Sequence, residues 1–177
     1  RIRLALEPEP SCLLETAAET CEFFEKYLGD ERTRRYVGVC LDTCHMAVEF
    51  EDPAQLLTTF ARAGVDVVKV QISSALDVSP KSIGALRPFA EDTYLHQVVA
   101  RHGGSLERFV DLPDALAHAG VNDEWRVHFH VPLFLAELGP LRTGSAGQSI
   151  AFADFGDFPA TAEHPEGETF TFRFAGQ

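Results

Sequence analysis

Residues 36–42 read YVGVCLD, and TCH follows directly at residues 43–45. An unbroken run of β-prone residues without alternating polar side chains is typical of a strand that is buried on both faces of a parallel sheet. The sequence on either side of this run repeats one pattern, a short strand followed by an amphipathic helix. We therefore expect an α/β fold made of right-handed βαβ units with an all-parallel sheet.

The segment upstream of this run supplies the first strand and helix of the pattern. Residues 2–7 predict a strand, which the two prolines of Pro8-Glu9-Pro10 end. Residues 12–28 carry apolar side chains three and four positions apart, so they predict a helix. Ser11 is expected to cap this helix, and Gly29 is expected to stop it.

The segment downstream repeats the unit and then departs from it. Asp52-Pro53 predicts a helix start, Gly64 predicts its end, and residues 65–72 predict the next strand. Beyond Ser73 the expected elements are a loop at 80–87, a helix at 88–101 ending at His102-Gly103-Gly104, a helix at 112–118, a strand at 125–134 that Pro132 ends, and a strand at 168–174.

Charge excludes one class of function. The chain has 177 residues, with 15 Lys and Arg against 27 Asp and Glu, for a formal net charge of −12. Proteins bind nucleic acid by neutralising phosphates with clustered basic side chains, and this chain has no such stripe. We expect no nucleic-acid partner.

Composition also indicates the cellular compartment of the chain. No apolar run approaches the roughly 20 residues that a membrane-spanning helix needs, so we expect no membrane insertion. The four cysteines do not pair in a CxxC spacing, which favours reduced packing residues in a cytoplasmic protein. The first residue is Arg1 and it directly precedes a strand, so the chain reads as a piece of a longer protein.

Residue types that bind metals stand at the C-terminal ends of four predicted strands. They are Glu7, Asp42 with His45, His128 with His130, and Glu166 or Glu168. In parallel α/β barrels this end of the strands carries the active site, because the loops there converge. Histidines two positions apart on a strand share a face, and imidazoles with neighbouring carboxylates suit Zn²⁺, Mn²⁺ or a similar ion.

Other roles for these residues remain open. A single HxH in a strand is often hydrogen-bonded to backbone, Asp42 can close a turn through its own side chain, and Glu7 can be solvated. Gln71 at the end of the third strand is a candidate for substrate binding, or a core polar group bonded to backbone. His96 is a weaker substrate-binding candidate, because it falls on a predicted helix.

The run 38–45 resembles the Asp-Thr-x-His strand motif of the xylose isomerase-like barrel superfamily, which includes sugar epimerases and abasic-site nucleases of the endonuclease IV type. The segment 4–7, Leu-Ala-Leu-Glu, looks like the Glu-bearing strand of that group. A narrower resemblance is to the sugar isomerase-like (EboE) group of the ebo metabolite-traffic operons. It is carried by LALEPEP, CLDTCHMAVEFEDP, KVQISSAL, YLHQV and WRVHFHVPLF.

The resemblance implies a (β/α)₈ TIM barrel of the xylose isomerase-like type, with this chain supplying roughly its C-terminal half. Residues 1–177 would then form a single partial barrel domain, irregular at 141–160 where the last helix is expected. The implied metal ligands are Glu7, Asp42, His45, His128, His130 and Glu168. The implied catalytic bases are Glu7 and Glu168, and the implied substrate contacts are His45, Gln71 and His96. Gln71 stands where the superfamily has a histidine.

These expectations lead to a functional hypothesis with two alternatives. The first hypothesis is an isomerase or epimerase of sugars, cyclitols or related polyhydroxylated metabolites that depends on a divalent metal, Zn, Mn, Mg or Co. A barrel that binds a metabolite or a partner without catalysis is the first alternative. A phosphodiesterase of the endonuclease type is the second, and the absence of a basic surface argues against it.

Overall fold

The computed structural model describes residues 2–91, 93–118, 123–132 and 137–143, together with the backbone of the strands at 159–163 and 169–173. The chain divides into two compact units, Arg1–Gly147 and Gln148–Gln177. The second unit contains a hairpin in which β10 (Pro159–Glu163) pairs antiparallel with β11 (Thr169–Arg173). The strand expected at 168–174 is thus confirmed. The expected ligand Glu168 and its neighbour Glu166 lie outside the described residues.

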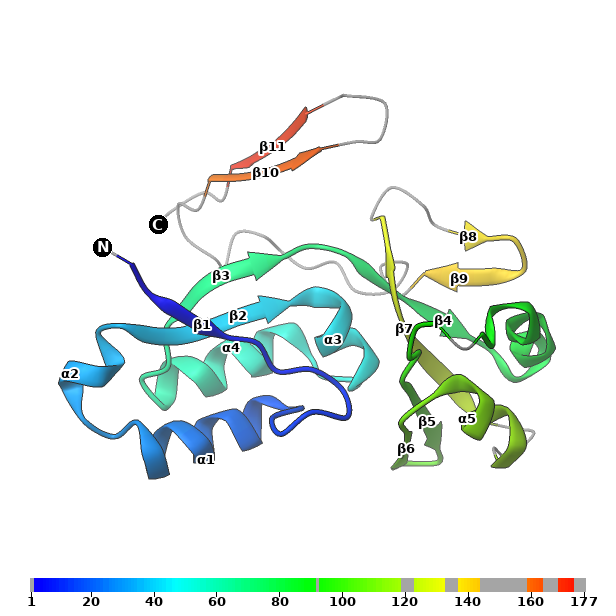
Figure 1. The fold of residues 1–177 in the computed structure, drawn as a ribbon, viewed down its shortest axis with the longest axis horizontal. Helices are drawn as coiled ribbons and strands as arrows, with labels where there is room; N and C mark the ends of the chain where they lie inside the picture. The colour runs from blue at the N-terminus through cyan, green and yellow to red at the C-terminus, as the bar shows by residue number, and fades with distance from the viewer. Residues whose placement is uncertain are drawn as a thin grey trace. The chain divides into compact units, whose positions relative to one another are not determined.

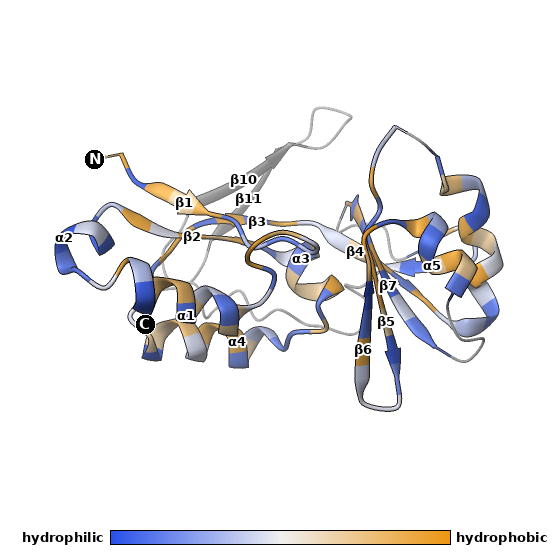
Figure 2. Cartoon of the chain, turned by 60° about the horizontal axis from the view of Figure 1, so that its bottom comes forward, coloured by the Kyte–Doolittle hydropathy of each residue, from blue (hydrophilic) through white to orange (hydrophobic). Residues whose placement is uncertain are grey.

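The first unit begins with a three-stranded parallel sheet in the order β1-β2-β3. Its strands are β1 (Leu4–Leu6), β2 (Val37–Asp42) and β3 (Val67–Gln71). Two helices, α1 (Ala17–Tyr27) and α4 (Pro53–Arg62), lie on one face of this sheet (Figure 1). Both helices alternate hydrophobic and hydrophilic bands (Figure 2), as the periodicity predicts. The strand–helix alternation expected around residues 36–42 is confirmed here.

The two long helices show how capping residues set the ends. Asp52 accepts a hydrogen bond from the backbone of Gln55, Pro53 opens α4, and Gly64 ends it with φ +64°, as expected. The start predicted for α1 is wrong, because Thr16 and Glu19 form a reciprocal capping box that begins the helix at Ala17. Ser11 instead adopts φ 63°, which is unlike the extended backbone of a helix N-cap.

The rest of the unit is a six-stranded sheet in the order β6-β5-β7-β4-β9-β8, and every described pairing in it is antiparallel. Its strands are β4 (Ser74–Val78), β5 (Val98–His102), β6 (Ser105–Phe109), β7 (Glu124–Val131), β8 (Glu137–Leu138) and β9 (Leu141–Thr143). The expectation of an all-parallel sheet is therefore wrong for this half. Only Ile72 and Ser73 join β3 to β4, which is too short for a parallel crossover.

The helix expected at 88–101 is also wrong. Residues Pro80–Phe89 form a 3-10 helix, η1, and Val98–His102 is the strand β5. The glycines at 103 and 104 form a hairpin turn to β6 rather than a helix end, with Gly103 at φ +62°. The helix expected at 112–118 is confirmed as α5 (Leu112–His118).

Two further differences concern short elements. The helices α2 (Glu31–Arg34) and α3 (Thr43–Val48) are absent from the sequence expectations, because four and six residues are too few to show a period. The strand β9 lies inside the stretch 141–160 that was expected to be irregular, and residues 144–158 lie outside the described part of the chain.

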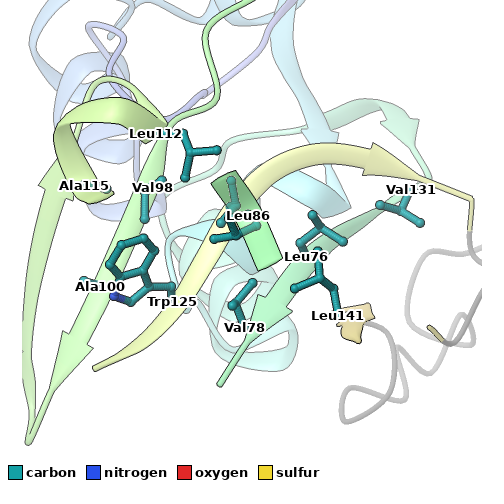
Figure 3. Close-up of a cluster of buried hydrophobic side chains, with 11 residues drawn as sticks. Leu76, Val78, Leu86, Val98, Ala100, Leu112, Ala115, Trp125, Val131 and Leu141 are labelled. Carbon is teal, nitrogen blue, oxygen red and sulfur yellow. The ribbon is translucent and has the colours of Figure 1, made fainter. Parts of the chain in front are cut away.

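The antiparallel sheet carries the main core (Figure 3). Trp125 of β7 is fully buried, and around it lie side chains from neighbouring strands and from the covering helices η1 and α5. The members of this cluster are Leu76, Val78, Leu86, Val98, Ala100, Leu112, Ala115, Trp125, Val127, Val131 and Leu141. Burial of this apolar surface holds η1 and α5 against the sheet.

The helix α3 connects the two sheets. It packs against β4 and β7, and its Cys44, Ala47 and Val48 share a buried cluster with Ala75 of β4 and Val99 of β5. At its C-terminal end, the buried carboxylate of Glu49 accepts hydrogen bonds from Nε and Nη2 of Arg108 on β6, at 2.9 and 2.6 Å. A bifurcated charged contact of this kind adds orientation to the apolar packing.

The described strands form sheets of three and six strands and the hairpin of β10 and β11, and none of these closes into a barrel. The (β/α)₈ barrel stays a prediction. Among the described strands, only β1, β2 and β3 have the parallel pairing that such a barrel requires. No helix in the described part of the chain is long and apolar enough to span a bilayer.

Gly38 supports a first prediction, about the parallel sheet. A Cβ at Gly38 would lie 2.6 Å from the carbonyl oxygen of Asp66 and 2.5 Å from Cγ1 of Val68. We expect Gly38→Ala to lower the free energy of unfolding by about 1–3 kcal/mol, because the backbone at Asp66 and the side chain of Val68 have to move away. Chemical denaturation measures this change. The control is Gly104→Ala, since no atom lies within 4 Å of that site, and an equal loss in both variants would contradict the prediction.

A second prediction concerns the buried carboxylate of Glu51. Burial raises the pKa of Glu51 to about 7, although its Oε1 accepts a hydrogen bond at 2.9 Å from the backbone of Ala17. With Asp42 and His45, Glu51 bounds a cavity of about 10 Å³, enough for one water molecule.

The native state therefore holds this proton in a pH range where the unfolded chain releases it, and stability falls as pH rises from about 4.5 to 7. We expect Glu51→Gln to remove this loss, which amounts to about 3 kcal/mol at most. Unfolding of both proteins measured across this range tests the prediction. Parallel pH profiles would contradict it.

Candidate functional site

The ends of the three parallel strands meet in one hydrogen-bonded group. Glu7 follows β1, Asp42 ends β2 and Gln71 ends β3. The Nε2 of Gln71 donates to Glu7 Oε1 at 2.5 Å and to Asp42 Oδ2 at 2.7 Å. The Nζ of Lys69 donates to Gln71 Oε1 at 2.5 Å. The expectation that these strand ends converge is confirmed for Glu7, Asp42 and Gln71.

Asp42 also positions the next candidate, His45. Its Oδ1 accepts hydrogen bonds from the backbone of Cys44 at 2.8 Å and of His45 at 3.4 Å, so it caps α3. The turn closed by the Asp42 side chain, one of the two readings of this residue, is confirmed, and the role of Asp42 as a metal ligand stays a prediction. The next residue, Thr43, exchanges hydrogen bonds with the backbone of Ser73, which fixes the end of β2 to the β3–β4 connection.

The second sheet contributes two histidines to the same place. His128 and His130 share a face of β7, as their spacing predicts, and their Nε2 atoms lie 3.0 Å apart. The Nε2 of His45 lies 3.1 Å from that of His128, although the two residues are 83 positions apart in the chain. The side chain of His45 is buried, whereas that of His130 is 51% exposed, so the group opens to solvent at His130.

The outer nitrogen of each ring has its own oxygen partner. The Nδ1 of His45 lies 2.9 Å from the carbonyl oxygen of Pro8, and the Nδ1 of His128 lies 2.7 Å from Oε1 of Gln97. The Nδ1 of His130 lies 2.8 Å from Oγ of Ser73. Carbonyl oxygens only accept, so His45 and His128 carry their hydrogen on Nδ1 and a neutral ring has its lone pair on Nε2. Metal-binding histidines are usually held by such outer partners.

The histidine cluster fits a divalent cation. If both rings are neutral, their Nε2 lone pairs, 3.1 Å apart, repel each other, and a cation bound to both nitrogens removes this repulsion. Two nitrogens bonded to one ion at about 2.1 Å, with an angle near 95° between the bonds, lie about 3.1 Å apart. The distances of 3.0 and 3.1 Å match this spacing.

Other possible ligands surround the three histidines. Asp42 Oδ2 lies 3.9 Å from Nδ1 of His130 and 4.0 Å from Nε2 of His45. Three overlapping groups have potential ligand atoms within 4.8 Å of one another: Cys44 with His128 and His130, Glu9 with His45 and His128, and Asp42 with His45 and His130. Glu9 and Cys44 are new in this role. Glu9 lies in the Pro8-Glu9-Pro10 segment, and Cys44 lies in the run 38–45. The packing of the two sheets brings both residues near His128.

Burial controls the charge of the buried groups. Desolvation, followed by the nearby rings of His45 and His130, lowers the pKa of His128 to about 4, so this imidazole is neutral at neutral pH. Desolvation also raises the pKa of the Cys44 thiol, whose Sγ donates to the carbonyl oxygen of Phe129 at 3.3 Å. Without a bound metal, the Cys44 thiol is therefore protonated at neutral pH, and the four cysteines are all free.

Three other histidines of the described residues lie elsewhere. The ring of His96 stacks on Phe129, 4.1 Å between centroids, and Phe129 alternates with His128 and His130 along β7. His102 pairs with Asp123, and His118 binds the backbone of Asp114 within α5. The structure thus places His45 beside His128, and it places Gln71 beside Glu7 and Asp42. The substrate-binding role of His96 stays a prediction.

Gln97 and Ser73 are further site residues that the sequence analysis does not identify. Gln97 lies beside His128 because Val98 of β5 pairs with Val127 of β7, and a backbone hydrogen bond also joins Gln97 to His128. Such outer partners depend on strand pairing, which no local sequence pattern reports. No protein-family model, curated protein or solved structure matches this chain.

The lowered pKa of His128 gives a prediction for the metal-free chain. Between about pH 4 and 6.5 the unfolded chain binds a proton at this residue that the native state excludes, so stability is lost as pH falls through this range. We expect His128→Gln to lose less stability than the wild type between pH 7 and 4, by up to about 3 kcal/mol. Unfolding of chelator-treated proteins at several pH values measures the difference. Equal losses would show that His128 titrates normally.

Proposed function

We propose that this chain forms the metal-binding part of a divalent-metal-dependent isomerase or epimerase that acts on a small polyhydroxylated metabolite such as a sugar or cyclitol. The observation that carries the proposal is the position of His128, whose Nε2 lies 3.1 Å from Nε2 of His45 and 3.0 Å from Nε2 of His130. The carboxylate of Asp42 lies 4.0 Å from His45 and 3.9 Å from His130. The resemblance of residues 4–134 to the xylose isomerase-like superfamily and its sugar isomerase-like members supports the same class of reaction.

One of the three overlapping groups would hold the ion, and each of them contains two of the histidines. Its identity among Zn²⁺, Mn²⁺, Mg²⁺ and Co²⁺ is left to experiment. When bound, a divalent cation polarises a carbonyl or hydroxyl oxygen of the substrate and so makes the adjacent C–H more acidic. The open side of the cluster, at the half-exposed His130, is where a substrate reaches it.

Among the described residues, Glu7 is the candidate to move the proton. Its side chain is partly exposed, and its Oε1 lies 4.0 Å from Nδ1 of His45. In an isomerisation, Glu7 would take a proton from one carbon and return it to the neighbouring carbon on the same face, so it ends the cycle unchanged. Asp42 and Gln71 hold Glu7 in place through the shared amide.

A binding module without catalysis is the second candidate. The observation that favours it is the Gln71 amide, which engages both Glu7 and Asp42 and leaves no free carboxylate pair. The net charge of −12 disfavours polyanionic ligands, so we propose no nucleic-acid partner in either case.

The metal part of the proposal is tested by metal analysis of the chain purified without chelator and reconstituted with each ion. We expect His130→Ala and His128→Ala to lose at least about tenfold in metal affinity, because each removes a ligand or a ring in contact with one. The matched control is His102→Ala, a 79% exposed histidine paired with Asp123, which should bind as the wild type does. Absence of bound metal in the wild type would overturn the proposal.

The catalytic part is tested by proton exchange. A panel of aldoses, ketoses and cyclitols is incubated in D₂O with the metal-loaded chain, and NMR follows deuterium entry at the carbon next to the carbonyl or hydroxyl. We expect exchange with the wild type and its loss in Glu7→Gln with metal content unchanged. Bound metal without exchange on any member of the panel would leave the binding module as the function.

A further inference from the structure

The carboxylate of Glu9 belongs to one of the three groups of potential metal ligands, together with His45 and His128. One oxygen of Glu9 and one ring nitrogen of each histidine lie within 4.8 Å of one another. The preceding residue, Pro8, also holds His45, because its carbonyl oxygen lies 2.9 Å from Nδ1 of that ring. The segment that follows β1 therefore contacts His45 through Pro8 and brings Glu9 to the same place.

The turn after β1 fixes the backbone of Glu9. Its N–H donates to the carbonyl oxygen of Leu14 at 2.9 Å, and its carbonyl oxygen accepts from the backbone of Cys12 at 3.1 Å. Prolines at positions 8 and 10 restrict the backbone on both sides. A ligand on a fixed backbone loses little conformational freedom when an ion binds.

The carboxylate of Glu9 is little engaged by the rest of the chain. Among the described residues, no N–H group donates a hydrogen bond to it. Its neighbour is the exposed thiol of Cys12, whose pKa is raised by desolvation and then by the negative charge of Glu9. A thiol is a weak hydrogen-bond donor. The carboxylate of Glu9 can therefore bind a cation without giving up a strong hydrogen bond.

Asp42, the carboxylate of another group, has existing contacts to lose. Its Oδ1 caps α3 through the backbone of Cys44, and its Oδ2 accepts from Nε2 of Gln71 at 2.7 Å. Oδ2 also lies 4.0 Å from Nε2 of His45 and 3.9 Å from Nδ1 of His130. One ion bonded at about 2.1 Å to two atoms 4.0 Å apart needs an angle of about 145°, which is far wider than the tetrahedral angle.

Cys44, the third candidate, is engaged as well. Its thiol donates to the carbonyl oxygen of Phe129 at 3.3 Å, and its side chain is fully buried in the apolar cluster with Ala75 and Val99. Binding an ion through sulfur requires the loss of both the proton and this hydrogen bond. Glu9 has no such bond to give up.

We propose that Glu9 is the carboxylate ligand of the ion, and that Glu9, His45 and His128 form a three-ligand site for Zn²⁺ with one open position. Each histidine binds through Nε2, because its Nδ1 faces the oxygen of Pro8 or Gln97. Two histidines and one carboxylate with an open fourth position are a ligand set of catalytic zinc sites. The open position takes a water molecule or an oxygen of the substrate.

This inference rests on the proposed function and selects one of its three groups. Each of the other two groups needs either His45 or His128. Because each of these rings has only Nε2 free, an ion in the Glu9 group leaves neither other group complete. We therefore expect one ion per chain. Glu7 keeps its hydrogen bond to Gln71 and stays out of the ligand set, as its role as a base requires.

The first experiment is a Zn²⁺ titration of the metal-free chain and its variants. We expect one ion per chain in the wild type and a loss of about a hundredfold or more in affinity in Glu9→Gln, because a ligand is removed. The matched control is Glu25→Gln, the same change at an exposed position on α1, which should bind within about threefold of the wild type.

The same titration tests the two rival groups. Asp42→Asn retains a good helix cap, and it should bind Zn²⁺ within about tenfold of the wild type. Cys44→Ala should bind within about threefold, because the thiol lies outside the ligand set. A loss of a hundredfold or more in either variant, with Glu9→Gln unchanged, would overturn the inference.

The second experiment reads the ligands of the wild type directly through bound Co²⁺. The Glu9 group contains no sulfur, so the spectrum should lack the near-ultraviolet charge-transfer band that a thiolate ligand gives. The visible bands should change in Glu9→Gln and stay as in the wild type in Glu25→Gln, because these bands report the ligand set and not stability. A thiolate band in the wild type would make Cys44 a ligand and overturn the inference.

The outcomes separate the two proposals. If the wild type binds no ion, the proposed function fails and this inference fails with it. If the wild type binds one ion and Glu9→Gln binds it equally well, only the role of Glu9 is overturned. A second ion in the wild type would also overturn it, because the Glu9 group leaves too few free histidine nitrogens for another group.

Discussion

The carboxylate of Asp42 both caps the helix α3 and holds the ends of the parallel strands together. One oxygen caps α3, and the other accepts from Gln71, which in turn contacts Glu7. The side chain is buried, and an unpaired carboxylate in that position would cost several kcal/mol. The hydrogen bonds that offset this cost fix the direction of α3 and the ends of all three parallel strands. The position of His45, on the first turns of α3, follows from them.

The direction of α3 then determines how the two sheets meet. Its apolar side packs on β4 and β7, and its C-terminal Glu49 binds Arg108 of β6. The chain reaches β4 only two residues after β3, and Thr43 binds one of these two residues, Ser73. These contacts bring β7 against α3, so the HxH pair of β7 lies beside His45. A site made from both sheets results from packing that is mostly apolar.

Sequence patterns predicted elements whose signals lie within about ten residues. The helix from Pro53 has an Asp cap, a proline at its first position and a terminal glycine, and each of these acts on local backbone geometry. The same kind of signal misled at 88–101, where His102-Gly103-Gly104 suits a helix end and a hairpin turn equally well. What decides between them is the burial of Val98, Val99 and Ala100 against β7, which is a long-range contact. The capping box of Thr16 and Glu19 is also a local signal. The helix was nevertheless predicted to begin at residue 12, because apolar side chains with helical spacing continue upstream of Thr16.

The sequence by itself determined which chemical groups stand at the strand ends and which of them share a face. Glu7, Asp42 and Gln71 follow from parallel strands, and His128 with His130 follows from the two-residue period of a strand, because both depend on backbone geometry alone. Only the tertiary structure decided that β7 is antiparallel, that its histidines face His45, and that Pro8, Gln97 and Ser73 hold the outer ring nitrogens. These relations join residues far apart in the chain. They depend on the apolar cluster around Trp125, whose burial stabilises one strand order over the others.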